Sequence, residues 1–306
     1  MRGKDLIAAT LFGGAGGSSG GGSGGGWPDV PDDGATYLYI TLTEGRTSPM
    51  LGVCVQGTMT IDWGDGSDPE TKTGTNLNAS VHTSNHAYAK PGDYVIRLTV
   101  DGGMGFRGDS ASPIGSAILR KNAKSDYSNV IYQSALRGVK MGDGVSKINE
   151  NAFRDCYGLE FVVFPENMKT VGNNTFYCCP RLSSVDLPAQ LSEISNYMFR
   201  TCYNIKAVTI PKSVEKINDF AFYSCYNISS ITIPGSVNYI GSGAFYYCYG
   251  MAYYDFTACT AVPTLANTNA FTGITDDCEI RVPAALYDEW VAATNWATYA
   301  DYIKAY

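Results

Sequence analysis

Tyrosine is the residue type whose spacing most clearly predicts a binding surface in this sequence. The chain has 306 residues and 22 tyrosines, and seven of these stand at multiples of 23 residues from one another in two series. One series is Tyr157, Tyr203, Tyr226 and Tyr249, and the other is Tyr177, Tyr223 and Tyr246. Tyrosine gives a large contact area at low entropic cost together with a hydroxyl that hydrogen-bonds, so binding surfaces favour it. These seven are therefore candidate ligand-binding residues; the alternative is that stacked rings only cover the edge of a core.

No pattern typical of an enzyme, a metal site or a cofactor site occurs in the sequence. There is no G-x-S-x-G, no H-E-x-x-H and no phosphate-binding glycine loop, and neither His82 nor His86 has a plausible nucleophile in its sequence context. The nine cysteines show no C-x-x-C spacing, which argues against zinc. A hydrolase that uses two carboxylates has no local signature and stays open. We predict a protein that is not an enzyme, with no catalytic residue, no metal and no cofactor.

Charge and hydropathy argue against two further kinds of partner. The formal net charge is −7 and the isoelectric point is about 4.9, and no cluster of lysine and arginine is dense enough to follow a phosphate backbone. Nucleic acid is therefore not an expected partner. No apolar run approaches the roughly 18–20 residues of a membrane-spanning helix, so we expect no membrane span.

The elements that must position the tyrosines are repeats of 23 residues. Four columns recur at this step between about Leu136 and Phe256. The columns are Phe153, Phe176, Phe199, Phe222 and Phe245; Cys156, Cys179, Cys202, Cys225 and Cys248; Ile148, Val171, Ile194, Ile217 and Ile240; and Pro165, Pro188, Pro211 and Pro234. Such self-similarity is the signature of a solenoid, in which each repeat buries its apolar columns against its neighbours. Residues 130–145 fit a degenerate first repeat that caps the core.

The cysteine column predicts buried free thiols rather than disulfides. Cysteines one repeat apart lie about 5 Å apart in a solenoid and point the same way, and parallel Cβ directions disfavour the disulfide dihedral. A buried free cysteine behaves as a small apolar residue. The odd total of nine also fits reduced thiols better than a disulfide framework.

The repeat resembles that of the BspA-like leucine-rich repeat family. The family unit reads roughly I-x-x-x-x-F-x-x-C-x-x-L-x-x-V-x-[IL]-P, and it stands here as Ile217-Asn-Asp-Phe-Ala-Phe222-Tyr-Ser-Cys225-Tyr-Asn-Ile228-Ser-Ser-Ile231-Thr-Ile233-Pro234. The resemblance covers about 120 residues. It implies a curved, right-handed solenoid that serves adhesion and recognition, without catalysis.

Residues from Trp27 to about Gly103 carry strand-like patterns and three motifs in a fixed order. Asp62-Trp63-Gly64-Asp65-Gly66-Ser67 is followed by His86-Ala-Tyr88 and by Pro91-Gly92-Asp-Tyr94-Val-Ile-Arg-Leu98-Thr-Val100. This order resembles the polycystic-kidney-disease-type (PKD-like) module, which implies an immunoglobulin-like β-sandwich. The sequence departs from the family at Asp62-Trp63, where Asp-Phe is common.

The first of these motifs predicts a tight turn. Its glycines permit positive φ and its aspartates accept backbone N–H groups. His86 stands at the family's structural histidine position, so the resemblance implies that it hydrogen-bonds this turn. The alternative is a calcium site at Asp62, Asp65 and Asp68, because hard cations take carboxylate oxygens.

The first 26 residues predict an attachment device. Met1 to Phe12 carries two basic residues and a short apolar run, and Gly13 to Gly26 is a flexible glycine- and serine-rich coil. Leu6, Ile7 and Leu11 share one face of a short helix and are the candidate anchor residues. A secretory signal and a disordered tail without a role are the alternatives.

The repeat spacing changes near the C-terminal end. Phe271 follows Phe245 by 26 residues, so about three residues are inserted near Ala258 to Pro263. Residues 284–293 and 296–304 then predict two short helices that cover the open end of the solenoid and its sheet edge.

The predicted fold is mainly β, and its parts follow one another along the chain. They are an anchor segment and glycine-rich linker (1–26), a PKD-like β-sandwich (27–107), a linker (108–129), a right-handed leucine-rich-repeat solenoid (130–262) and a small C-terminal helical cap (263–306). The predicted function is non-enzymatic recognition by a virion-associated tail or head fibre protein, which joins the virion through its N-terminus and binds a host cell-surface protein or glycan. The alternatives are a secreted bacterial adhesin, placed extracellularly or at the cell envelope, and a structural decoration protein without a ligand.

Overall fold

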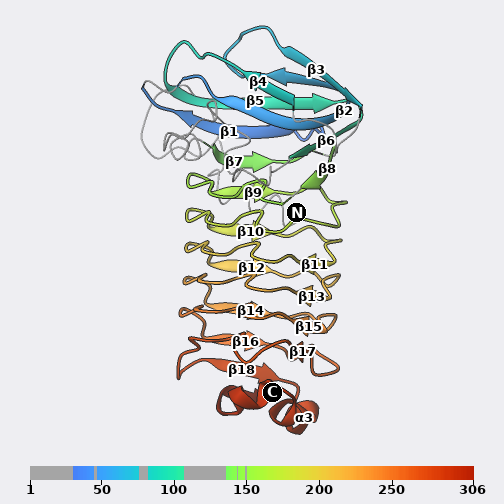
Figure 1. Ribbon diagram of the computed structural model, residues 1–306, viewed down its shortest axis with the longest axis vertical. Helices are drawn as coiled ribbons and strands as arrows, with labels where there is room; N and C mark the ends of the chain where they lie inside the picture. Colours follow the sequence, from blue (N-terminus) through green and yellow to red (C-terminus); the bar gives the residue numbers. More distant parts are fainter. Residues whose placement is uncertain (1–29, 45–46, 76–81, 107–135, 143, 149) are drawn as a thin grey trace.

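Stacked rungs form a long column in the second half of the chain, and a group of longer strands lies at its N-terminal end (Figure 1). The computed structural model describes residues 30–44, 47–75, 82–106, 136–142, 144–148 and 150–306. The described chain is mainly β, a solenoid of about seven turns with few helices. The predicted fold class is confirmed at this level.

Two series of short strands run along the column, and within each sheet a strand pairs in parallel with the same strand of the next rung. The first strand of successive rungs is β7 (Leu136–Lys140), β9 (Phe161–Val163), β10 (Ser184–Asp186), β12 (Ala207–Thr209), β14 (Ser230–Thr232), β16 (Tyr253–Asp255) and β18 (Glu279–Val282). The second is β11 (Glu193–Ile194), β13 (Lys216–Ile217), β15 (Tyr239–Ile240) and β17 (Thr264–Leu265). Phe161 pairs with Ser184 and Ser184 with Ala207. No pairing joins the next two strands of this series, β12 and β14. Residues that pair between these neighbouring strands are 23 positions apart, so the period seen in the sequence sets the register of the sheet. Gly138 pairs with Phe161 at the same step, which confirms the degenerate first repeat.

A stack of phenylalanine rings runs through the core of the column. The rings of Phe153, Phe176, Phe199, Phe222 and Phe245 lie nearly parallel, with neighbouring centroids 5.4–5.6 Å apart. Phe271 continues the stack at 5.5 Å from Phe245. The extra residues before Phe271 are therefore accommodated outside the stack, and the rung spacing is kept.

The cysteine column lies beside this stack, and four of its five thiols donate a hydrogen bond to a phenylalanine carbonyl. Cys179 Sγ donates a hydrogen bond to the carbonyl oxygen of Phe153 at 3.1 Å, and Cys202 donates to Phe176 at 3.0 Å. Cys225 and Cys248 repeat this contact one rung later each. The predicted free, buried thiols are confirmed. The thiol is more than an apolar filler, because it is a second donor to a buried carbonyl; Phe153, for example, also accepts the backbone N–H of Cys156.

We expect the column cysteines to resist alkylation in the folded protein. The thiolate is the reactive species, and burial raises the pKa of Cys248 to about 12. At pH 8 this leaves a thiolate fraction on the order of 10⁻⁴, before burial blocks access. Mass spectrometry after iodoacetamide treatment should find Cys202, Cys225 and Cys248 unmodified, and all nine cysteines modified in denaturant. Rapid native labelling of Cys225 would contradict the buried ladder.

The N-terminal strands continue the sheet of the solenoid rather than standing apart from it. They are β1 (Thr36–Leu42), β2 (Met50–Asp62), β3 (Glu70–Thr75), β4 (His82–Asn85), β5 (Gly92–Val100), β6 (Gly103–Phe106) and β8 (Val145–Ile148). β1 pairs antiparallel with β5 on one side and with β7 on the other, and β6 pairs in parallel with β8. These strands therefore cover the first rung. The PKD-like resemblance and the domain limits stay predictions, and the predicted linker 108–129 lies outside the described residues.

The Asp-Gly turn after β2 is held by the histidine that the sequence indicated. His86 Nε2 lies 2.7 Å from the Asp65 carboxylate, and its ring stacks on Trp63 at 4.9 Å. Asp65 also accepts hydrogen bonds from the backbone and hydroxyl of Ser67. The bonds from Ser67 and His86 lower the pKa of Asp65 to about 2. The predicted contact between His86 and the turn is confirmed.

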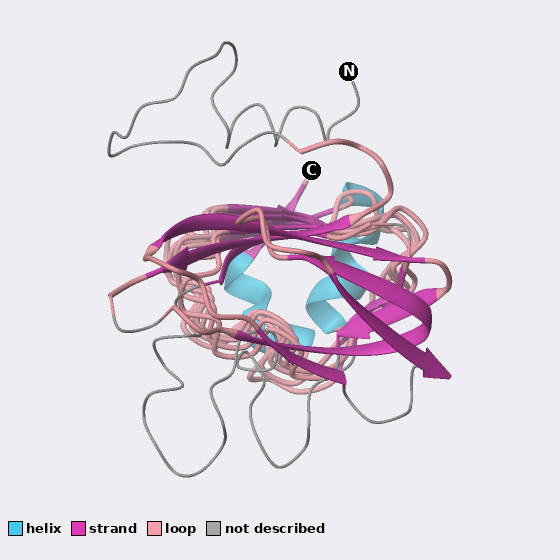
Figure 2. Cartoon of the chain, turned by 90° about the horizontal axis from the view of Figure 1, so that it is seen from above, coloured by secondary structure: helices cyan, strands magenta, loops and turns pink. Residues whose placement is uncertain are grey.

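The C-terminal cap differs in part from the prediction. A 3₁₀ turn (Ala284–Leu286) leads into α3 (Tyr287–Ala292), and Trp296–Tyr302 is a 3₁₀ helix. Residues Ile303–Ala305 form β19 instead of helix and pair with β18. The prediction of helix to residue 304 was wrong because the open edge of β18 offers backbone partners there. Seen down the column, the helices lie within the outline of the rungs, so they cover its end (Figure 2).

Candidate functional site

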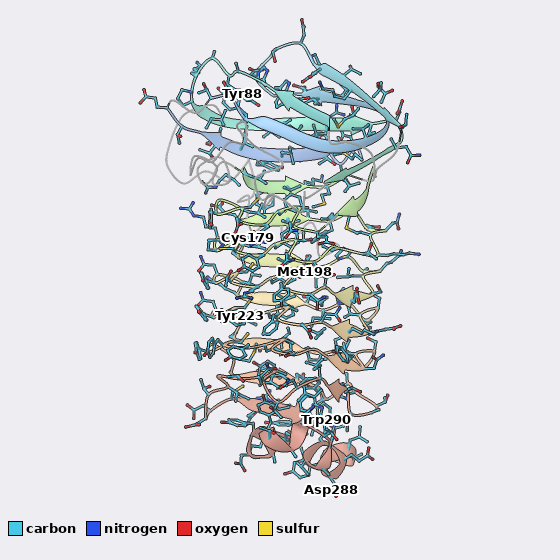
Figure 3. The ribbon with its side chains drawn as sticks, viewed as in Figure 1. Tyr88, Cys179, Met198, Tyr223, Asp288 and Trp290 are labelled. Carbon is cyan, nitrogen blue, oxygen red and sulfur yellow. The ribbon has the colours of Figure 1, made fainter. Side chains whose placement is uncertain are left out.

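Two left-handed residues in each rung shape the turn that carries the tyrosines. They stand four residues apart, with φ between 53° and 60° in the rungs from Asn151 to Tyr247. The pairs are Asn151 and Asp155, Asn174 and Cys178, Tyr197 and Thr201, Phe220 and Ser224, and Gly243 and Tyr247. Positive φ reverses the chain locally, so residues beside the buried phenylalanine and cysteine point away from the core. The turns therefore form one continuous flank of the column. Tyr223, on this flank, lies at the side of the column (Figure 3).

The column after the phenylalanines alternates arginine with tyrosine. The Arg154 guanidinium lies 4.5 Å from the Tyr177 ring centroid. Arg200 lies between two rings, 5.4 Å from Tyr177 and 4.4 Å from Tyr223. Tyr223 then stacks on Tyr246 at 5.3 Å. Cations over aromatic faces are attracted by the ring quadrupole, so these five side chains form one continuous stack.

The column after the cysteines is a stack of tyrosines alone. Tyr203 and Tyr226 lie 5.0 Å apart, and Tyr226 and Tyr249 lie 5.8 Å apart. These three rings are 37 %, 39 % and 50 % exposed. Tyr157 belongs to the same series, but Pro180 interrupts the row and Tyr157 is half-buried. Burial and the nearby Asp155 carboxylate raise the pKa of Tyr157 to about 12. The structure therefore brings six of the seven candidate tyrosines into two stacks and leaves Tyr157 apart.

Tyr247 joins the two stacks, and the periodicity of the sequence did not single it out. Its ring lies 4.2 Å from Tyr246 and 5.2 Å from Tyr249. It occupies the second left-handed position of its rung, where earlier rungs have Asp155, Cys178, Thr201 and Ser224. The residue type changes along that column, so only the shared backbone conformation could have revealed it. We call the surface made by Tyr177, Arg200, Tyr203, Tyr223, Tyr226, Tyr246, Tyr247 and Tyr249 the tyrosine flank.

Neighbouring side chains cover most of the ring faces in the tyrosine flank. Tyr226 is covered on both faces by Tyr203 and Tyr249. Tyr249 lies between Tyr226 and Tyr247, and Tyr223 lies between Arg200 and Tyr246. The exposed parts are ring edges and hydroxyls, which suit hydrogen bonding and edge contact rather than stacking on a flat sugar face.

The polar groups of the tyrosine flank are largely available to a partner. Within the described part of the chain, the hydroxyls of Tyr203, Tyr226 and Tyr249 have no hydrogen-bond partner, and Arg200 has no carboxylate within ion-pair distance, although its Nε is buried. Burial raises the pKa of Tyr203 and Tyr249, so both hydroxyls are neutral donors at neutral pH. A hydrogen bond with Tyr247 raises the pKa of Tyr246.

The other predicted sites add little to this surface. The candidate anchor residues Leu6, Ile7 and Leu11 lie outside the described residues. In the ranges that the structure covers, no three His, Cys, Asp or Glu side chains are grouped to hold a metal ion. No helix among the described residues is long and apolar enough to cross a membrane.

Comparison with solved structures gives partial matches to leucine-rich repeat proteins. A leucine-rich repeat protein of T. pallidum is 28 % identical, with a TM-score of 0.36 over 39 % of this chain and 64 % of that one. A leucine-rich cell surface protein of Faecalibacterium prausnitzii is 27 % identical, with a TM-score of 0.35 over 42 % of this chain and 41 % of that one. The chain thus spans less than two thirds of the length of either.

Comparison of sequences identifies the repeat itself. No curated protein matches the chain. The model of the BspA type leucine-rich repeat region matches in six copies over residues 126–252, and no catalytic family is indicated. These residues include the phenylalanine and cysteine columns and the tyrosine flank. Residues 126–252 therefore carry BspA-type leucine-rich repeats.

Proposed function

We propose that this chain is a non-enzymatic recognition protein that binds a protein partner through the tyrosine flank. The observation that carries the proposal is the set of stacked tyrosines with covered faces and unused hydroxyls. A rigid row of rings loses little entropy on binding, and its hydroxyls supply hydrogen bonds. BspA-type repeats support a role in interaction rather than catalysis.

The partner that fits this surface is a protein with an acidic group. Arg200 is held between Tyr177 and Tyr223, so its guanidinium is oriented before binding. A carboxylate opposite it would form a charge-assisted hydrogen bond. A glycan is the weaker candidate because stacking on a sugar ring needs an open aromatic face, and Tyr223, Tyr226 and Tyr249 are covered on both faces.

The place of action that we propose is a surface, either of a virion or of a bacterial cell. The glycine-rich stretch 13–26 would tether the column, and Leu6, Ile7 and Leu11 would anchor it. A tail or head fibre is the leading form and a secreted adhesin is the rival. Mass spectrometry separates them: a chain that begins at Met1 in purified virions supports the fibre, and cleavage within 13–26 in a cell-envelope fraction supports the adhesin.

The test of recognition is a whole-cell binding assay with the labelled full-length chain. The triple variant Tyr203→Ser, Tyr226→Ser and Tyr249→Ser should lose at least about tenfold in binding, because truncated aromatic hot spots cost about 1.4 kcal/mol or more together. Pretreatment of the cells with protease should abolish binding, and periodate oxidation of their glycans should not.

A matched control keeps this result interpretable. The variant Lys212→Ser, Glu215→Ser and Asn238→Ser changes three exposed residues away from the tyrosine flank and should bind as the wild type does. Both variants should keep the wild-type melting temperature. Loss of binding after periodate alone would replace the protein partner with a glycan, and no binding by any form would favour the structural decoration role.

A further inference from the structure

A row of exposed residues runs beside the tyrosine flank and changes charge from one end to the other. Its members follow one another at successive rungs and are Arg181, Asn204, Asn227, Gly250 and Asp276. The first four are 23 residues apart, and Asp276 follows after 26. β16 and β18 pair at this same step of 26, as Tyr253 with Glu279, so the row continues across the enlarged last rung. We call these five residues, with the exposed neighbour Asp277, the polar row.

Contacts between rungs hold the polar row against the tyrosines. Asn227 Nδ2 donates a hydrogen bond to the carbonyl oxygen of Tyr203 at 2.8 Å and lies 3.4 Å from Asn204 Oδ1. A Cβ atom on Gly250 would come within 2.2 Å of the carbonyl oxygen of Tyr226. The polar row and the stack of Tyr203, Tyr226 and Tyr249 are therefore two edges of one strip.

The two ends of the polar row carry opposite charges that are weakly paired. The Arg181 side chain is 57 % exposed. Among the described residues its one carboxylate within ion-pair distance is Glu160 at 3.8 Å, and Arg137 already binds that carboxylate. At the other end, no cation of the described chain lies within ion-pair distance of Asp276 or Asp277.

The middle of the polar row is neutral. Asn204, Asn227 and Gly250 separate the charged ends, and the tyrosine hydroxyls beside them can both donate and accept hydrogen bonds. Four rung steps of about 4.8 Å place Arg181 roughly 19 Å from Asp276. Asn227 stands at the centre of this distance, two rungs from each end.

A partner for this strip needs the same features in the reverse order. It needs a carboxylate opposite Arg181, a cation opposite Asp276, and hydrogen-bonding neutral groups between them at the rung spacing. A second copy of the chain, turned about a two-fold axis at Asn227, has each of these groups at the required place. A residue on such an axis meets its own copy, so a neutral centre avoids like charges there.

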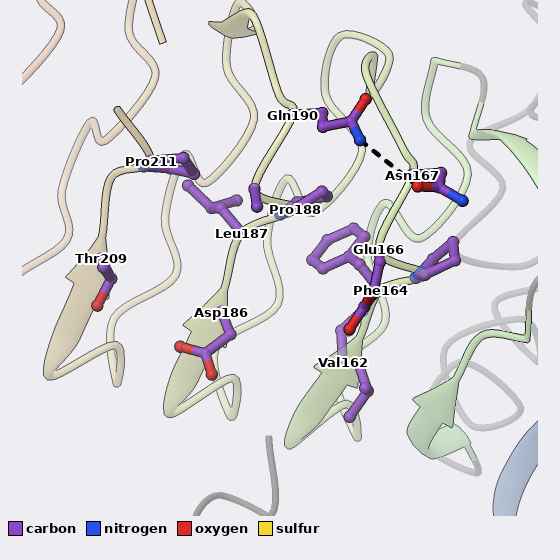
Figure 4. Close-up of a pocket in the computed structure, with 13 residues that line it drawn as sticks. Val162, Phe164, Glu166, Asn167, Asp186, Leu187, Pro188, Gln190, Thr209 and Pro211 are labelled. Carbon is purple, nitrogen blue, oxygen red and sulfur yellow. Dashed lines mark hydrogen bonds between the residues drawn. The ribbon is translucent and has the colours of Figure 1, made fainter. Parts of the chain in front are cut away.

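The groove at the ends of β9, β10 and β12 does not offer this match (Figure 4). It has a volume of about 550 Å³, with Phe164, Leu187 and prolines in its walls, and its charged lining residues are Glu166 and Asp186. None of the described residues that line it is a lysine or an arginine. Two copies of the groove would bring carboxylates together, so it does not select a second copy.

We infer that two copies of this chain associate antiparallel through the polar row and the tyrosines beside it. Arg181 of each copy faces Asp276 of the other, and the Tyr203 ring edge of each lies near Tyr249 of the other. A strip of this length is at the small end of interfaces, so the dimer forms only as the concentration rises. The inference goes beyond the proposed function, because it uses the same flank but needs no cell. A cell-surface partner and a second copy then compete for that flank.

Analytical ultracentrifugation of the full-length chain tests the dimer without cells. The average mass should rise from monomer toward dimer between about 1 and about 100 µM. About 0.5 M NaCl should weaken the dimer, because it screens exposed charges. A monomer at every concentration would overturn the inference and leave the recognition function standing. Dimers of a chain that binds no cell would do the reverse.

Charge reversal at the two ends tests the antiparallel arrangement. Arg181→Glu places like charges opposite Asp276, and Asp276→Lys places like charges opposite Arg181. Each variant alone should associate at least about fivefold more weakly than the wild type. An equimolar mixture should recover heterodimers of about wild-type affinity, because both ends of the mixed pair again carry opposite charges. Unchanged association of either variant, or no recovery in the mixture, would overturn the arrangement.

A matched variant separates this contact from a general effect of net charge. Lys212→Glu changes the charge as much as Arg181→Glu does, at an exposed residue outside the polar row. It should associate as the wild type does. A loss equal to that of Arg181→Glu would mean that net charge alone sets the association, and would overturn the proposed contact.

A disulfide trap locates the two-fold axis. Asn227→Cys places two thiols opposite each other at the axis, so oxidised glutathione should give a disulfide-linked dimer on a non-reducing gel. Asn204→Cys alone should link no more than the wild type, because Gly250 of the other copy stands opposite it. A mixture of Asn204→Cys and Gly250→Cys should link. Equal linking of Asn204→Cys and Asn227→Cys would overturn an axis at Asn227.

Discussion

Replacing Phe222 with alanine is expected to lower the free energy of unfolding by about 3–5 kcal/mol. The side chain is fully buried, and its ring lies between Phe199 at 5.5 Å and Phe245 at 5.4 Å. Alanine would leave a ring-sized gap in the middle of the stack, and the neighbouring rungs cannot close it because their backbone spacing is set by the sheet. The measurement is urea-induced unfolding followed by circular dichroism.

Two controls show whether the gap is the cause. Phe222→Leu keeps most of the volume and should cost much less than alanine. Thr232→Ala changes an exposed residue in the following strand and should stay within about 0.5 kcal/mol of the wild type. A loss below about 1 kcal/mol for Phe222→Ala would mean that the ring stack does not hold the column together.

This sensitivity follows from how a solenoid is stabilised. Each rung contacts only its neighbours, so stability is close to a sum of rung and interface contributions. A central break therefore separates the rungs that contain Tyr203 from those that contain Tyr249, and the tyrosine flank should lose its continuity with the core. Hydrogen exchange should accelerate first in residues 216–232, and only later near the capped ends.

The repeat could be predicted from the sequence because identical residue types mark it. Phenylalanine, cysteine and proline recur every 23 residues, and the same step appears as the pairing of Phe161 with Ser184 and of Ser184 with Ala207. The hydrogen bond from each thiol to a phenylalanine carbonyl could not be predicted. It joins residues 26 apart, such as Cys179 and Phe153, and depends on where a backbone carbonyl points.

The tyrosine flank could be predicted as a set of residues but not as a surface. Periodicity indicated Tyr203, Tyr226 and Tyr249, yet it did not show that their rings cover one another. Ring orientation depends on the left-handed turns, which Tyr247 shares with Ser224 despite a different side chain. Tyr247 shares only its backbone conformation with the other residues of its column, so a search for a recurring residue type could not find it.

The continuity between the N-terminal strands and the column was also missed. β1 and β7 pair across about 100 residues of sequence, and neither strand carries a local signal for this partner. The limits of the PKD-like module and of its linker stay predictions. The observed pairing makes the first rung and the N-terminal strands one sheet, which removes an exposed sheet edge.

Gly138 marks this junction, and replacing it with valine is expected to destabilise the protein by about 1–3 kcal/mol. Gly138 pairs with Tyr39 of β1 on one side and with Phe161 of β9 on the other. The Phe161 ring lies over the glycine and meets Tyr39 edge-on at 5.2 Å. A Cβ atom at residue 138 would overlap that ring, and the ring is only 3 % exposed, so it must leave its contact with Tyr39.

A double-mutant cycle separates this steric cause from a general loss of strand stability. If the ring is the obstacle, removing it makes room, so Gly138→Ala combined with Phe161→Ala should cost less than the sum of the two single changes by at least about 1 kcal/mol. Amides of β1 should exchange faster in Gly138→Val, while those of β16, five rungs away, should not change. Additive costs would mean that the glycine is needed for its backbone alone. A coupling of the expected sign would show that the fit of the Phe161 ring over Gly138 stabilises the junction that the pairing of β1 with β7 forms.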